Sequence, residues 1–167
     1  DKWSGAPTHA ADDVLSDALD TEGVAAAALL GGSAEPLRRS LAVALAAGLE
    51  EPAGRAYANL HALHADRWEF SAAERWYRDG LGYCLEHDID TFTTCLRGAR
   101  TRTLERTGRW DAAVELGESV LRVTGSSPIN RINPLVAVGL VRARRGDGDA
   151  ARLLDEALAA AVGSGEP

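Results

Sequence analysis

The chain has 167 residues and a formal net charge of −7, and this length suits one compact domain or a short repeat array. No apolar run of about 18 residues without a charge occurs, and the first residues lack the pattern of a signal peptide. The acidity disfavours nucleic-acid binding across the whole surface, although a local basic face remains compatible with it. We therefore expect a cytoplasmic protein that contacts no membrane and binds no nucleic acid directly.

The choice of residues predicts an all-α fold. The sequence holds 31 Ala, 21 Leu and 17 Arg, which are among the strongest helix formers. Aromatic residues make up 5% of the chain, and no stretch alternates apolar and polar residues for long enough to indicate a strand. Cys84 and Cys95 are too few for a disulfide framework, so they indicate small buried side chains in a reducing compartment.

Glycines and prolines mark the ends and starts of the expected helices. Glycines follow apolar runs where a helix ends, and Pro36, Pro52 and Pro134 stand where first turns begin. Ser71 and Glu74 have the spacing of a capping box. We expect helices at residues 10–19, 21–30, 34–47, 52–65, 71–87, 91–107, 111–123, 130–145 and 149–162.

The helices repeat in pairs. Shifts of 37 to 40 residues align leucines and alanines of successive pairs, such as Leu41 with Leu81. Each second helix carries a small residue where two helices of a pair would approach closely: Ala73, Ala113 and Ala150. The pattern predicts a single helical-repeat domain over residues 1–167, with pairs at 21–47, 52–87, 91–123 and 130–162.

Two sets of sequence segments resemble known proteins. Residues 68–81, WEFSAAERWYRDGL, and 108–121, GRWDAAVELGESVL, resemble the turn and second helix of tetratricopeptide-like (TPR-like) repeats. GLEEPAGRAYANL (48–60), AERWYRDGLGYCLEHDID (73–90) and SPINRI (127–132) resemble the helical-repeat region of large ATP-dependent bacterial regulators of the LuxR type. In that family an ATPase module precedes the repeats and a helix-turn-helix domain follows them. The resemblance implies a TPR-like right-handed superhelix of antiparallel helix pairs, an α-solenoid, as part of a longer chain.

Four potential zinc ligands occur in two pairs, His61-x-x-His64 and Cys84-x-x-His87. In an antiparallel helix pair, His64 would lie opposite residue 72, so Cys84 would stand about 18 Å along the partner helix. One zinc ion cannot bridge that distance. We therefore expect no metal site and no cofactor.

The sequence also offers no catalytic constellation. Most carboxylates flank expected helix starts, where they cap the helix and complement its dipole. The sequence contains no GxSxG motif and no GxxxxGK[ST] loop, which would indicate a nucleophile elbow and a phosphate cradle. We expect no catalytic residue and no enzyme.

The tryptophans and the mid-helix glycines indicate packing between helices. The tryptophans fall at or beside expected positions between helices, which favours core packing over ligand stacking: Trp68, Trp76 and Trp110. Glycine inside a helix costs about 1 kcal/mol relative to alanine, so mid-helix glycines indicate close approach of a neighbour. These glycines are Gly80, Gly82 and Gly117.

Charge alternates between first and second helices. Residues 93–110 and 129–145 each carry a net charge of +4, whereas residues 69–92 and 146–167 each carry −4. First helices line the concave face of a TPR-like superhelix, so the pattern predicts a basic groove for an anionic partner. Its expected lining is Arg55, Asn59, Arg102, Arg106 and Arg142. The alternative is a scaffold in which these arginines pair with acids of the adjacent second helices.

These features favour an interaction and effector-sensing module of a multidomain bacterial transcriptional regulator. Its partner would be an anionic peptide, a neighbouring domain or an anionic effector. The apolar face of the last pair, 130–162, would also allow self-association. A free-standing TPR-like adaptor and a small-molecule-binding helical domain are the alternatives.

Overall fold

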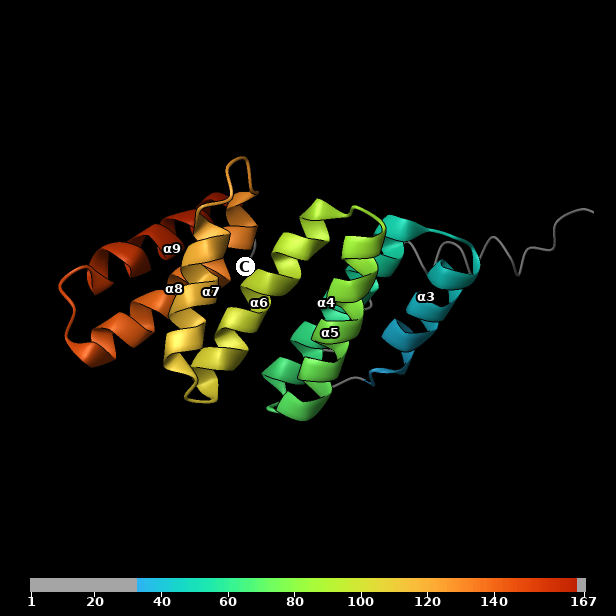
Figure 1. Ribbon diagram of the computed structural model, residues 1–167, viewed down its shortest axis with the longest axis horizontal. Coiled ribbons are helices and arrows are strands. Elements are labelled where there is room, and N and C mark those ends of the chain that lie inside the picture. Colours follow the sequence, from blue (N-terminus) through green and yellow to red (C-terminus); the bar gives the residue numbers. More distant parts are fainter. Residues whose placement is uncertain (1–32, 165–167) are drawn as a thin grey trace, which may run out of the picture. The chain divides into compact units, whose positions relative to one another are not determined.

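The structure is a computed structural model that describes residues 33–164 (Figure 1). All regular structure in this range is helical, which confirms the predicted all-α class. The helices are α3 (Glu35–Ala46), α4 (Glu50–Asp66), α5 (Phe70–Glu86), α6 (Asp90–Arg106), α7 (Trp110–Leu121), α8 (Pro128–Arg145) and α9 (Ala150–Ser164). Their ends lie within about two residues of those predicted. The helices expected at 10–19 and 21–30 lie outside the described residues.

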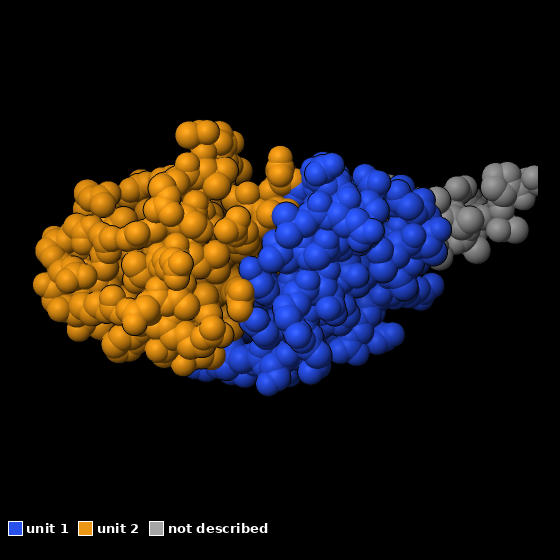
Figure 2. Space-filling view, viewed as in Figure 1, with its two compact units in different colours: residues 1–89 blue, residues 90–167 orange. Residues whose placement is uncertain are grey.

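The described residues fall into two compact units, coloured separately in Figure 2. Unit 1 (residues 33–89) holds α3, α4 and α5, and α4 packs against both neighbours. Unit 2 (residues 90–164) holds α6 to α9. Within unit 2, α6 and α7 form an antiparallel pair, α8 packs on both of them, and α9 packs on α8 (Figure 1). No helix in residues 33–164 combines the length and apolar character needed to cross a bilayer.

One kind of turn recurs every 20 residues. Gly48, Trp68, Asp88 and Gly108 all adopt positive φ angles of 54° to 77°, each just past a helix end. At each turn the next amide donates a hydrogen bond of 2.8–2.9 Å to a carbonyl five residues earlier. This is the Schellman closure, which satisfies carbonyls left open at a helix end. It accounts for the 40-residue period of a helix pair.

The same turn explains why the predicted capping box is wrong. Helix α5 starts at Phe70, with Glu69 at the N-cap, so Ser71 already lies inside the first turn. No side chain forms a capping hydrogen bond at this N-cap. The Glu69 carboxylate instead contacts Nδ1 of His64.

Each unit has an apolar core of helix-facing residues. In unit 1 the core is built around Leu37, Leu41, Leu60 and Leu63. In unit 2 Leu135 and Val138 of α8 pack with Leu153 and Ala157 of α9. The small residues expected at contacts between helices are buried, with 0% exposure for Ala73 and Ala113 and 8% for Ala150, which confirms that prediction.

The tryptophans only partly follow the expected core packing. Trp76 packs against the unit 1 core beside Tyr57, with ring centroids 6.2 Å apart. Trp68 is 65% exposed and Trp110 36% exposed, so the prediction is wrong for both. Trp68 lies in the Schellman turn between α4 and α5, and Trp110 is the first residue of α7.

Glycine and proline together bring α8 close to α6 and α7. Pro128 opens α8, so Pro134 lies inside the helix, and the prediction that it starts a first turn is wrong. A proline there removes the amide that would bond the Asn130 carbonyl. That carbonyl oxygen lies 3.0 Å from where a Cβ on Gly98 would stand. A Cβ on Gly117 would stand 2.5 Å from Cγ2 of Val138, which confirms the predicted close approach of a neighbouring helix.

Gly82 does not share this role. A Cβ added to Gly82 would meet nothing within 4 Å, so the expectation of a close neighbour is wrong at this position. Gly80 is buried in α5, in agreement with a packing position.

Alkaline pH is expected to destabilise the fold. Burial raises the pKa of the Cys95 thiol, and burial followed by nearby acidic groups raises the pKa of Tyr57 and Tyr83. Since each folded-state pKa exceeds its unfolded-state value, this stability is fully present below about pH 8.5 and is lost as pH rises through the folded-state values. The urea concentration at the midpoint of unfolding should therefore decrease as the pH is raised from about 8.5 to about 10.5. Cys95→Ala should flatten this dependence, and a pH-independent midpoint would contradict the prediction.

Candidate anion-binding cleft

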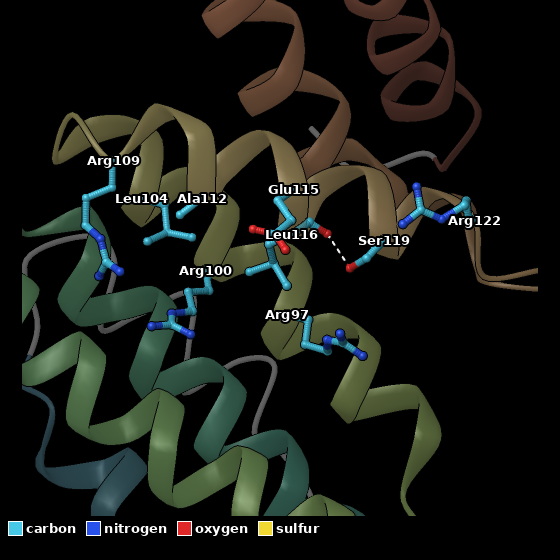
Figure 3. Close-up of a pocket in the computed structure, with 9 residues that line it drawn as sticks. All are labelled: Arg97, Arg100, Leu104, Arg109, Ala112, Glu115, Leu116, Ser119 and Arg122. Atoms are coloured by element: carbon cyan, nitrogen blue, oxygen red, sulfur yellow. Dashed lines mark hydrogen bonds between the residues drawn. The ribbon is translucent and has the colours of Figure 1, made fainter.

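A cleft of about 350 Å³ opens between α6 and α7 in unit 2 (Figure 3). Arg97 and Arg100 reach it from α6, while Arg109 and Arg122 stand at the N-cap and C-cap of α7. The other residues that line it are Leu104, Ala112, Glu115, Leu116 and Ser119. The cleft therefore combines four guanidinium groups with one carboxylate.

Helical phase explains this arrangement. Gly98, Thr101 and Glu105 recur at three- and four-residue spacing and form the buried side of α6, where Gly98 meets α8. Arg97 and Arg100 stand one position earlier, about 100° around the helix, and line the cleft together with residues of α7. Leu104 and Leu116 provide the apolar floor between the two helices.

The cleft remains positively charged. Within residues 33–164, no carboxylate forms an ion pair with Arg97, Arg109 or Arg122. Glu115 is the one acidic residue in the lining. A guanidinium group presents a planar fork of donors that matches a carboxylate or a phosphate. The cleft is thus suited to an anionic group or segment.

The arginines predicted for a groove stand elsewhere. Arg55 and Asn59 lie half-buried on α4 of unit 1. Arg102 and Arg106 lie on α6 and Arg142 on α8, all in unit 2. The five residues therefore do not form one site within a single unit, and none of them lines the described cleft.

Two of these arginines are engaged by carboxylates. Arg142 pairs with Glu118 of α7 and with Asp149, which precedes α9. Burial alone would lower the pKa of the Arg142 guanidinium, but the hydrogen bonds and charges of Glu118 and Asp149 outweigh it and raise the pKa. Arg102 pairs with Glu105 of its own helix at 2.8 Å. At these two positions the geometry favours the salt-bridged scaffold.

The basic segment predicted from charge supplies three of the four arginines of the cleft, but the arginines that repeat alignment chose within it do not line the cleft. The net charge of +4 over residues 93–110 includes all three of Arg97, Arg100 and Arg109. Repeat alignment selected Arg102 and Arg106 instead. Which face of α6 lines the cleft depends on where α8 packs, and the sequence of residues 93–110 does not predict that position. Arg122 lies just after α7, outside the segment singled out by charge.

The histidines have separate surroundings. The ring nitrogen Nδ1 of His61 lies 2.9 Å from the carbonyl oxygen of Ala73, and Nδ1 of His87 lies 3.2 Å from Glu50. His64 contacts Glu69. No group of three or more His, Cys, Asp and Glu residues in the described part of the chain is arranged to hold a metal ion.

No family model, curated protein or solved structure matches the chain. A proposal for its function therefore depends on the chemistry of the cleft and on the resemblance in the sequence.

Proposed function

We propose that the chain is a helical-repeat interaction and sensing module whose basic cleft binds an acidic segment of a partner protein. The observation that carries this proposal is the set of four arginines around an apolar floor between α6 and α7. Three of them have no ion pair within residues 33–164, so a partner's carboxylates can engage them without first displacing an internal acid.

The cleft suits an amphipathic acidic helix. Arg109 and Arg122 cap opposite ends of α7, and the 12 residues of the helix between them place their backbones about 20 Å apart along its axis. A helix of similar length would place apolar side chains on Leu104 and Leu116 and glutamates towards the arginines at the rim. Helices lying in grooves in this way are a recurring mode of peptide recognition.

Binding fits the cleft better than catalysis does. Ser119 supplies the hydroxyl in the lining, and it donates a hydrogen bond of 2.7 Å to the Leu116 carbonyl (Figure 3). Nucleophilic catalysis by serine needs a general base that accepts the hydroxyl proton. A guanidinium group carries only donors and cannot accept that proton. Ser119 donates to the Leu116 carbonyl and not to Glu115, the one carboxylate in the lining.

The resemblance of residues 48–60, 73–90 and 127–132 supports placing this module in a large LuxR-type bacterial transcriptional regulator. We propose that the helix pairs continue there as a TPR-like right-handed superhelix in the cytoplasm. A partner that binds one state of the regulator more tightly would shift its equilibrium towards that state. The flanking coding sequence tests this assignment: a Walker motif upstream and a helix-turn-helix domain downstream would distinguish the regulator from a free-standing adaptor.

Acidic peptides are expected to bind the cleft through its arginines. The experiment measures fluorescence polarisation of a labelled amphipathic peptide with leucines on one face and glutamates on the other, added to the full chain. Arg109→Gln combined with Arg122→Gln should weaken binding roughly three- to tenfold, since surface ion pairs contribute about 0.2–1 kcal/mol each. Raising the salt concentration should reduce the wild-type affinity by screening these charges.

Matched reagents separate a local effect from one of net charge. Arg38→Gln combined with Arg39→Gln removes the same charge from exposed positions of α3 and should leave peptide binding unchanged. A peptide in which lysines replace the glutamates should bind much more weakly. Equal binding of the two peptides, or equal weakening by both arginine pairs, would show that the cleft is not the site.

A further inference from the structure

A second cavity in unit 2, about 580 Å³ in volume, has a lining rich in hydroxyl groups. Its lining comes from the first turns of α6, the loop between α7 and α8, and the first turn of α8. Six threonine and serine side chains line it: Thr91, Thr93, Thr94, Thr124, Ser126 and Ser127. Arg97, Asp90 and Asn130 add a cation, an anion and an amide.

Ser126 shows that this lining is not internally satisfied. Its Oγ is buried and has no hydrogen-bond partner among the described residues. A buried polar group without a hydrogen bond destabilises the fold, so an external partner explains this hydroxyl better. Ser127, at the N-cap of α8, also makes no capping hydrogen bond with its side chain.

Two features of the lining favour an anionic group. Arg97 forms no ion pair within residues 33–164, and its guanidinium fork matches the oxygens of a phosphate. The loop residues Ser126 and Ser127 lead directly into the N-terminus of α8, which starts at Pro128. The positive end of a helix dipole adds to the attraction for an anion there.

The rest of the lining favours hydroxyl groups on the ligand. Serine and threonine hydroxyls both donate and accept hydrogen bonds, and the Asn130 side chain does the same through its amide. The Asp90 carboxylate accepts hydrogen bonds from hydroxyl groups but repels a second anionic centre. The lining therefore suits a ligand that carries one phosphate and several hydroxyl groups.

We propose that this cavity is a binding site for a sugar phosphate, with Arg97 holding the phosphate and the hydroxyl side chains holding the sugar. The site differs from the peptide-binding cleft in its lining, and it extends the proposed function by assigning a small-molecule effector to the module. Arg97 lines both cavities. For that reason the peptide experiment leaves Arg97 intact, and either proposal can fail without the other.

The test is a titration of the full chain with ribose 5-phosphate, ribose and inorganic phosphate, followed by two-dimensional ¹H–¹⁵N NMR. Ribose 5-phosphate is expected to shift amide signals of residues 90–97 and 123–130 and to bind about tenfold more tightly than either of its parts. Arg97→Gln should weaken that binding by about tenfold, and Ser126→Ala should weaken it several-fold. Arg97 is exposed, so its substitution should leave the folded spectrum intact.

Arg109→Gln is the matched control, because Arg109 lines the cleft but not this cavity. It should leave binding of ribose 5-phosphate unchanged. Equal affinity for inorganic phosphate would overturn the assignment to a sugar phosphate, because the hydroxyl lining would then contribute nothing. Absence of saturable shifts, or shifts unaffected by Arg97→Gln, would overturn the site itself.

Discussion

Removing both arginines that hold the buried carboxylate of Glu105 is expected to destabilise unit 2 by about 3 kcal/mol. The Glu105 side chain is only 4% exposed, and it pairs with Arg102 on its own helix and with Arg144 on α8. Arg102→Ala combined with Arg144→Ala would leave this carboxylate buried without either cation. A buried carboxylate that loses its cations keeps much of its desolvation cost without the ion pairs that offset it.

A matched variant and a rescue make this test specific. Arg145→Ala removes the same residue type from the end of the same helix, but its partner Asp111 is 97% exposed, so the loss should stay below about 1 kcal/mol. Adding Glu105→Gln to the double variant should recover part of the stability, because a neutral amide needs no cation. Urea unfolding followed by circular dichroism measures all four proteins. Equal losses for the double variant and Arg145→Ala would contradict the argument.

Gly117→Ala and Gly82→Ala are expected to change stability in opposite directions. At Gly117 the new Cβ would stand 2.5 Å from Cγ2 of Val138, whose side chain is buried. Valine in a helix has one strongly preferred rotamer, so this methyl group cannot easily turn away. Overpacking of this kind costs roughly 1–3 kcal/mol, against a gain of about 1 kcal/mol in helix propensity.

At Gly82 the gain in helix propensity is not offset by any overpacking. The position is exposed in the middle of α5 and its added methyl group meets nothing within 4 Å, so Gly82→Ala should raise the free energy of unfolding by about 1 kcal/mol. The two free-energy changes should therefore differ by roughly 1–3 kcal/mol, the cost of overpacking at Gly117. Thermal unfolding of both variants measures the difference. A stabilising Gly117→Ala would mean that α7 and α8 can move apart at little cost.

The number, order and ends of the described helices could be predicted from local patterns. Helix formers fill the segments, and Gly48, Gly108 and Gly146 mark Schellman-type ends through their tolerance of positive φ. Trp68 and Asp88 take the same conformation without the glycine signal. Their turns were predictable only from the repeat, because tryptophan disfavours a left-handed backbone and aspartate adopts it less readily than glycine.

Residues distant in the sequence decided which charges are available. Arg142 meets Glu118, 24 residues earlier in the chain, whereas Arg97 and Arg109 meet no carboxylate in residues 33–164. The composition of α6 predicted a basic helix. Which face of α6 is exposed depends on the close packing of α8, which Gly98 and Gly117 allow. Periodicity and punctuation act within a few residues, so the sequence by itself determined the helices. The face that each helix presents depends on contacts across the fold, so only the tertiary structure decided which arginines line the cleft.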